Sequence, residues 1–181
     1  MLGIIIGVAS VITLVAVIQG MTKVSMLMME SMGINRIDMY YYGDSSRVRE
    51  DMLEYAEEDL GDYVLGMTPN AQTKQKVKYR TKEMDSYIYF GNEDYALCSA
   101  QTIASGRNIT AEDCKRQSRV VVIGEAVRKN FFGAMSPLGQ KIKINGQSYT
   151  VVGTFDGKYG GKLNTEDQMI LAPYTLSLIH I

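Results

Sequence analysis

An uncharged apolar segment at the start of the chain constrains the fold more than any other feature. Residues 2–18 read LGIIIGVASVITLVAVI, and Ser10 and Thr13 are the only polar residues among them. A helix of this length extends roughly 26 Å at about 1.5 Å per residue, which approaches the hydrocarbon thickness of a bilayer. Both hydroxyls can hydrogen-bond the backbone of their own helix, so lipid tolerates them. We therefore predict a transmembrane helix over residues 1–20.

Two alternatives for this segment are a cleaved signal peptide and a buried helix of a soluble protein. A signal peptide begins with a basic region and ends in a small-x-small cleavage site. No Lys or Arg precedes the apolar core, and VAVIQG matches such a site poorly. A buried helix of a soluble protein has polar positions that this segment lacks. Both alternatives are weaker than a membrane span.

Small residues recur along the predicted membrane helix at steps of three or four. They are Gly3, Gly7, Ser10, Thr13, Ala16 and Gly20. A stripe of this kind lets a second helix approach closely in lipid. We expect Gly3, Gly7, Ser10 and Thr13 to form a helix-packing face; the alternative is the chance clustering of small residues in an apolar segment.

The chain after this helix alternates between short helical and strand-like patterns. Residues 21–34 continue as a helical stalk that Gly33 ends, and residues 35–42 alternate as a half-buried strand does. Further helices are predicted over residues 47–60 and 125–132 and after Thr110, which is a candidate N-cap. Further strands are predicted over residues 73–82, 86–90, 119–123, 141–144, 147–152 and 168–172. The predicted fold class is α+β.

Asn145 and Gly146 separate two alternating runs, a pattern that strongly indicates a two-residue hairpin turn. We expect this turn to fix the strand register and to have no role in substrate binding.

Basic residues occupy every second position of the predicted strand over residues 73–82. They are Lys74, Lys76, Lys78, Arg80 and Lys82. A strand directs all of them to one side. Such a row suits an acidic partner or anionic headgroups, but protection of an exposed sheet edge is the favoured interpretation.

The sequence offers little for catalysis, cofactors or metals. A net charge of −1 argues against a strongly basic nucleic-acid binder, and two cysteines with one histidine are too few for a four-ligand zinc site. The segments 153–158 and 157–162 resemble phosphate loops but have one residue too few between the glycine and the Gly-Lys pair. We expect no enzymatic activity, no cofactor and no bound nucleic acid.

Cys98 and Cys114 are the two cysteines of the chain. A disulfide between them is permissible outside the cytoplasm, where closing such a loop stabilises a fold by about 3 kcal/mol. Two thiols are equally compatible with the sequence, which does not reveal the Cα separation.

Several segments resemble, in order, MacB-type ABC transporter permeases. LGIIIGVASVI resembles the first membrane helix of that family, and SMGINRIDMY resembles its stalk-to-strand junction. The segments that follow in the same order are GRNITAEDC, RVVVIGEAV, FFG, SPLGQKIKING, YTVVGTF and APYT. The final TLSLIHI does not resemble the family continuation, so we interpret the chain as a fragment with residues 176–181 as a non-native tail.

The resemblance implies a domain over residues 35–175, incomplete at its C-terminus, with a porter-like lobe and an inserted β-rich lobe. It also implies a permease in the cytoplasmic (inner) membrane with most of this chain extracytoplasmic. The partners would be an ABC ATPase, fused or separate, and a second permease in a homo- or heterodimer. The domain would couple ATP-driven motion to the export or release of a substrate. The alternative from another class is a single-pass, membrane-anchored binding or sensor domain.

Overall fold

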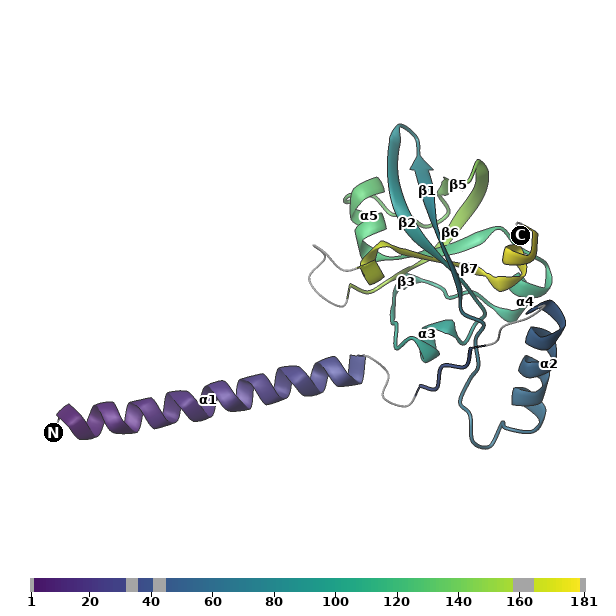
Figure 1. Cartoon of the computed structure of the whole chain (residues 1–181). Coiled ribbons are helices and arrows are strands. Elements are labelled where there is room, and N and C mark those ends of the chain that lie inside the picture. Colours follow the sequence, from purple (N-terminus) through teal and green to yellow (C-terminus); the bar gives the residue numbers. More distant parts are fainter. Residues whose placement is uncertain (1, 32–35, 41–44, 158–164, 180–181) are drawn as a thin grey trace. The chain divides into compact units, whose positions relative to one another are not determined.

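The computed structural model describes residues 2–31, 36–40, 45–157 and 165–179. The chain divides into two units, Met1–Met39 and Tyr40–Ile181. The first unit consists mainly of α1 (Leu2–Ser31), one continuous helix (Figure 1). Within α1, Gly3–Met26 is long and apolar enough to cross a membrane.

The two hydroxyls of the predicted membrane span hydrogen-bond the backbone of the helix itself. Ser10 Oγ donates to Gly7 O at 2.8 Å, and Thr13 Oγ1 donates to Ala9 O at 2.8 Å. Because these bonds need no outside partner, the hydroxyls do not prevent insertion into lipid. The predicted stalk is the same helix as the predicted membrane span, while Gly33, its predicted end, lies outside the described residues.

The strand predicted over residues 35–42 is not formed at residues 36–40, which are described and have no strand pairing. Ile37 and Met39 alternate with Arg36 and Asp38 as predicted, yet Ile37 is 87 % exposed. Alternation makes a strand only where a neighbouring strand supplies backbone hydrogen bonds. None of the described strands pairs with this segment, so this prediction is wrong there.

The second unit is built around one mixed seven-stranded sheet. Its strands are β1 (Ala71–Tyr79), β2 (Lys82–Gly91), β3 (Ile103–Gly106), β4 (Val120–Ile123), β5 (Lys141–Ile144), β6 (Gln147–Phe155) and β7 (Met169–Pro173). Its helices are α2 (Ser45–Glu58), α3 (Tyr95–Cys98), α4 (Ala111–Lys115), α5 (Glu125–Phe131) and the 3-10 helices η1 (Thr165–Gln168) and η2 (Tyr174–Ile179). The predicted α+β class is confirmed.

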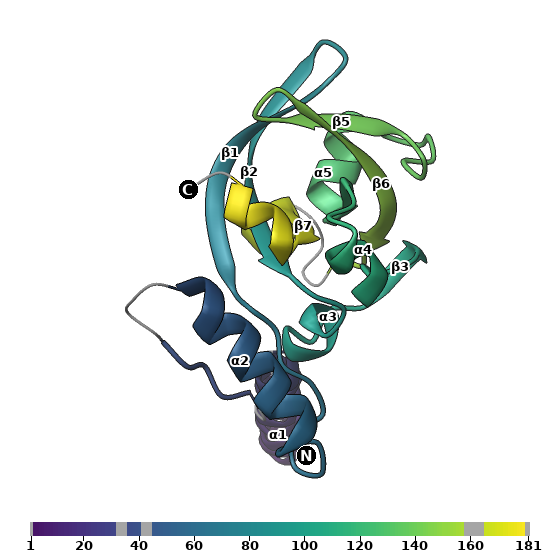
Figure 2. The same ribbon diagram turned by 90° about the vertical axis from the view of Figure 1, so that its right-hand side faces the viewer.

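The sheet closes into a barrel because β6 pairs on both of its edges. Thr150 pairs with Lys141 of β5 on one edge and with Val120 of β4 on the other. The order β6-β4-β7-β2-β1-β5 then returns to β6, and Figure 2 shows β1 and β2 opposite β5 and β6. Further along β6, Gly153 pairs with Gly106, so β3 continues on the edge that β5 leaves.

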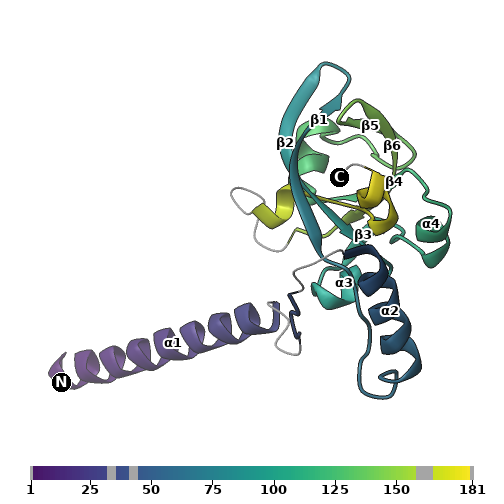
Figure 3. The same ribbon diagram turned by 45° about the vertical axis from the view of Figure 1, so that its right-hand side comes forward.

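Apolar side chains fill the barrel and also cover part of its outer face. The inner cluster takes residues from every strand of the closed ring and from α5, including Val77, Ile88, Val121, Phe131 and Ile142. A second cluster lies on the other face of β4 and β7, where α3 and α4 cover it (Figure 3). All five residues of β7 are buried because both of its faces are covered, which explains its uninterrupted apolar sequence.

Candidate functional site

The hairpin turn between β5 and β6 has the backbone that its sequence favours. Asn145 has φ 49° and Gly146 has φ 80°, and Ile144 pairs with Gln147 across the turn. A type I′ turn requires positive φ at both central residues, which Asn and Gly adopt more easily than other residues. Ile142, Ile144 and Tyr149 then point into the barrel core.

Gly146→Val is expected to lower the free energy of unfolding by about 1–2 kcal/mol, because a β-branched residue at positive φ is strained. A Cβ at Gly146 would meet nothing within 4 Å, so backbone strain is the whole cause. Chemical unfolding of the purified chain in detergent measures this effect. Ser148→Val, an exposed position on the next strand, is the control and should change stability by less than about 0.5 kcal/mol. Unchanged stability in Gly146→Val would contradict the structural role of the turn.

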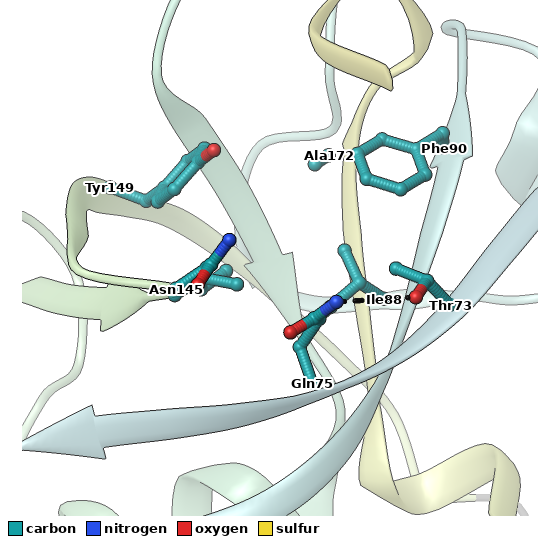
Figure 4. Close-up of a pocket in the computed structure, with 8 residues that line it drawn as sticks. Thr73, Gln75, Ile88, Phe90, Asn145, Tyr149 and Ala172 are labelled. Carbon is teal, nitrogen blue, oxygen red and sulfur yellow. Dashed lines mark hydrogen bonds between the residues drawn. The ribbon is translucent and has the colours of Figure 1, made fainter. Parts of the chain in front are cut away.

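A small cavity lies beside this turn, where β1 separates from the β5–β6 hairpin. Its volume is about 60 Å³. Figure 4 shows Asn145 and Tyr149 on one side and Thr73, Gln75 and Ile88 on the other. The remaining lining residues are Phe90, Ile144 and Ala172. The cavity has room for a few water molecules or one small aliphatic side chain.

The polar groups of this cavity come mainly from β1. Gln75 Nε2 donates to Thr73 Oγ1 at 3.4 Å, so the two inward-facing side chains satisfy each other in part. Ser86 is the register partner of Gln75 on β2, and its Oγ is buried without a hydrogen-bond partner among the described residues. Burial raises the pKa of the Tyr149 hydroxyl, although the charge of Arg119 opposes this effect. The phenol therefore stays protonated at neutral pH.

A second cavity of about 210 Å³ lies between α2 and the segment that leads into β1. Its one lining carboxylate, Asp94, accepts a hydrogen bond from Met67 N at 3.2 Å. The neighbouring Asn92 Nδ2 donates to Met67 O at 2.9 Å. These groups hold the backbone at Met67 in place and are therefore structural.

The described residues contain no group of three or more His, Cys, Asp or Glu side chains that could hold a metal ion. The glycine-lysine segments continue into residues 158–164, which lie outside the described residues together with His180. Gly153, which begins the first of them, is part of β6.

The two cysteines are thiols in the structure, which is one of the two alternatives that the sequence allows. Cys98 Sγ lies 3.5 Å from Gly66 O, whereas Cys114 Sγ lies 3.9 Å from Gly91 O. Each sulfur contacts the backbone of a different segment. Burial, with smaller effects of Glu93 and Asp113, raises the pKa of the Cys114 thiol to about 11, so this thiol is poorly nucleophilic.

The row of basic residues is shorter than the sequence predicts. Lys74, Lys76 and Lys78 lie on the outer face of β1 and are exposed. Arg80 instead occupies the β1–β2 turn with φ 54°, and its guanidinium lies over the Tyr79 ring. Lys82 Nζ donates to Asn130 O at 2.6 Å at the end of α5. The last two residues leave the row because the chain reverses at residues 80 and 81.

The small-residue stripe of α1 has no packing partner among the described residues. A Cβ at Gly3 or Gly7 would meet nothing within 4 Å. Ser10 and Thr13 are exposed and bond only their own helix. The helix-packing role of these residues stays a prediction.

Side-chain hydrogen bonds among three residues hold the loop between β3 and α4 in place. Thr110 and Asp113 form the capping box of α4, as the N-cap prediction for Thr110 implies. The third member, Arg107, was not predicted from the sequence. Its Nη1 donates to Asp113 Oδ2 at 2.6 Å, and its Nη2 donates to Asp113 Oδ1 at 3.3 Å. Its spacing from Asp113 carries no standard helix-start signal. Burial would raise the pKa of Asp113, but the hydrogen bonds from Arg107 and Thr110 together lower it.

Asp113→Asn is expected to lower the free energy of unfolding by about 2 kcal/mol at pH 7, because it removes charge-assisted hydrogen bonds from a buried position. The folded-state pKa lies below the ordinary value of 3.8, so the carboxylate stabilises the fold above that pH. This contribution is lost as the pH falls through the folded-state pKa. The difference in the free energy of unfolding between Asp113→Asn and the parent should therefore shrink below about pH 4. Urea titrations at pH 7 and below pH 4 measure this difference. A pH-independent difference would contradict this account.

Comparison with known proteins identifies relatives along the whole chain. A family model described as the MacB-like periplasmic core domain matches residues 1–181. The macrolide export ATP-binding/permease protein MacB of Hahella chejuensis is 30% identical over 189 residues, which cover 99% of this chain and 29% of that protein. The protein of the same name from Neisseria gonorrhoeae is 30% identical, with 97% of this chain and 28% of that protein covered. The chain thus spans less than a third of these relatives.

Solved structures support the fold. The periplasmic region of MacB from Actinobacillus actinomycetemcomitans superposes with a TM-score of 0.62 at 22% identity, covering 74% of this chain and 57% of that one. The extracellular domain of the noncanonic ABC-type transporter YknZ from Gram-positive bacteria gives a TM-score of 0.61 at 19% identity, covering 78% and 74%. At these identities the likeness concerns the fold alone.

Proposed function

Because this chain belongs to the family of MacB-like periplasmic core domains, we propose that its barrel domain transmits ATP-driven motion in an ABC transporter permease. The motion would originate in a partner ATPase, fused or separate, and would drive the export or release of a substrate. The family match over residues 1–181, which joins an apolar helix to the barrel, is the observation that carries this proposal.

The proposed location rests on α1 and on the family match. Large apolar side chains are exposed along this helix, including Ile4, Ile12 and Leu14, each more than 60 % exposed. A continuous apolar surface of this size requires a cover, and a bilayer covers a helix of this length. We therefore propose that α1 lies in the cytoplasmic (inner) membrane, and the match to a periplasmic core domain supports an extracytoplasmic location for the domain from residue 35.

The small-residue face of α1 suits contact with a further membrane helix of the same permease or of a second permease. Gly3 and Gly7 leave space beside the backbone, and lipid supplies no hydrophobic drive between helices, so close backbone approach matters there. This face is thus the proposed contact of α1 with a further membrane helix.

Distance measurements on the full-length permease and its ATPase in nanodiscs test the transmission of motion. A spin label attached through Met135→Cys occupies an exposed site after α5, in a Cys98→Ser background. Cys114 is buried, and its raised pKa makes it unreactive toward the label. The distance between the labels of the two permeases should differ between the nucleotide-free and the vanadate-trapped states.

A hydrolysis-deficient ATPase variant that cannot be trapped by vanadate is the control and should leave the distance unchanged. Identical distances in both states, with ATP hydrolysis intact, would contradict the proposal. A protein that purifies without any ATPase and has no further membrane helices in its reading frame would instead favour the anchored sensor.

A further inference from the structure

The edge of β1 that faces away from β2 is unpaired over most of its length. β1 pairs with β2 at every position from Ala71 to Tyr79, but it pairs with β5 only at Val77 and Lys78. The β5–β6 turn at Asn145 takes the next strand away from this edge. Along residues 71–76 no described strand supplies the missing hydrogen bonds. This edge, roughly 20 Å long at about 3.3 Å per residue, is a template for a further strand.

The small cavity lies directly beside this unpaired edge. Thr73 and Gln75 of β1 face it from one side, and Asn145 and Tyr149 face it from the other (Figure 4). A strand laid along β1 would occupy the place that the β5–β6 hairpin leaves open. Every second side chain of that strand would point toward the cavity, because strand side chains alternate between faces. The volume of about 60 Å³ suits a small aliphatic side chain such as valine.

The outer face at this edge is basic. Lys74, Lys76 and Lys78 are between 52 % and 61 % exposed. On the neighbouring β5, Lys143 is the register partner of Lys78, and the described residues provide no ion-pair partner for it. Glu83 and Asp85 are the acidic residues that oppose these lysines among the described ion pairs. Glu83 lies 2.5 Å from Lys78 Nζ, whereas the pairs Lys76–Glu83 and Lys74–Asp85 are 3.7 and 3.8 Å long and solvent-exposed, hence weak. The outward-facing side chains of an added strand would therefore meet net positive charge.

The positive charge beside the unpaired edge of β1 favours some binding partners over others. Pairing with β1 of a second copy would set the lysines of both copies beside each other, and like charges in such positions are destabilising. The same lysines favour Asp and Glu on an added strand by about 0.2–1 kcal/mol for each cross-strand pair. A lipid surface offers charge but no backbone groups to complete the sheet.

We propose that residues 71–76 of β1 bind an extended segment of a partner protein by strand addition, and that this segment alternates acidic with small aliphatic residues. Backbone hydrogen bonds would supply affinity, the cavity would select the aliphatic side chains, and Lys74 and Lys76 would select the acidic ones. This interaction does not depend on the transport role proposed above.

Hydrogen exchange on the full chain in detergent micelles tests the site. The probe is a blocked heptapeptide of alternating Glu and Val. Saturating peptide should slow, at least tenfold, the exchange of those amides of residues 71–76 that point to the unpaired edge. The exchange of the amides of β4 and β7 should not change. The same peptide with Gly in place of Val should bind at least tenfold more weakly. Absence of protection, or protection elsewhere in the barrel, would overturn the proposal.

Charge reversal tests the selectivity. Lys74→Glu/Lys76→Glu should weaken binding of the Glu-Val peptide at least tenfold and should gain binding of a Lys-Val heptapeptide, which shows that the variant is folded. Lys115→Glu/Lys129→Glu changes the net charge equally on α4 and α5 and should bind as the parent does. Equal binding of the Glu-Val and the Lys-Val heptapeptides by the parent would overturn the proposal. If the peptide-free chain forms a dimer, and Lys74→Glu/Lys76→Glu abolishes that dimer, the edge binds a second copy of the chain. This result would also overturn the proposal.

Discussion

Phe131→Ala is expected to lower the free energy of unfolding of the barrel domain by about 3–5 kcal/mol, the range for removing a large aromatic ring from a core. Phe131 is 2 % exposed. Its ring lies 6.1 Å from that of Tyr79 and meets the Phe132 ring edge-on at 6.4 Å. The cavity left by alanine lies between α5 and β1, two elements that the surrounding barrel holds in place, so collapse would be incomplete. Urea unfolding of the chain in detergent, followed by near-UV circular dichroism of its tyrosines, measures the change.

Met135→Ala is the control for this experiment. Met135 follows α5 closely in the chain but is 53 % exposed. Its truncation should change stability by less than about 0.5 kcal/mol. Equal losses for Phe131→Ala and Met135→Ala would show that α5 does not anchor the barrel core.

Gly153→Ala is expected to lower the free energy of unfolding by about 3 kcal/mol, because it overpacks two backbone segments that touch. A Cβ at Gly153 would clash with Arg107 O. Relief of this clash requires β6 to move away from the segment that bears Arg107, although Arg107 N donates to Val152 O at 3.0 Å. The pairing of Gly106 with Gly153 would be disturbed as well. Urea unfolding again gives the free energy.

Gly133→Ala separates this clash from backbone strain. Gly133 has φ 59°, but a Cβ there would meet nothing within 4 Å. Its substitution should cost only about 1–2 kcal/mol, from the left-handed backbone. In addition, Gly153→Ala should accelerate hydrogen exchange in β3, whereas Gly133→Ala should not. A smaller effect at Gly153 than at Gly133 would contradict the close approach of β6 to Arg107.

The cavity and the unpaired edge of β1 were not predicted from the sequence, although one signal for them was present. In β1, the inward positions change from Val77 and Tyr79 to the polar Thr73 and Gln75. This change marks the point where the strand leaves the apolar core. The position of the β5–β6 hairpin, which decides whether these polar side chains face a partner or a cavity, depends on residues some 70 positions away.

The sequence alone determined those features whose cause lies within a few adjacent residues. The uncharged segment determined α1, the Asn145–Gly146 pair determined the hairpin turn, and Thr110 determined the start of α4. In each case backbone geometry follows from the side chains at or beside the site. Prediction of these features therefore needed no knowledge of the remaining chain.

The tertiary structure decided which strands exist and where the sheet stays open. Residues 36–40 alternate like a strand and form none, whereas Ile103–Gly106 lacks alternation and becomes β3 because Gly153 and Phe155 pair with it. Long-range pairing also decides where the barrel closes. β6 pairs with β5, and β5 in turn pairs with β1 only at Val77 and Lys78, so residues 71–76 stay unpaired. A strand satisfies its backbone through hydrogen bonds to a distant segment, so its local sequence does not contain the information on whether that segment is there.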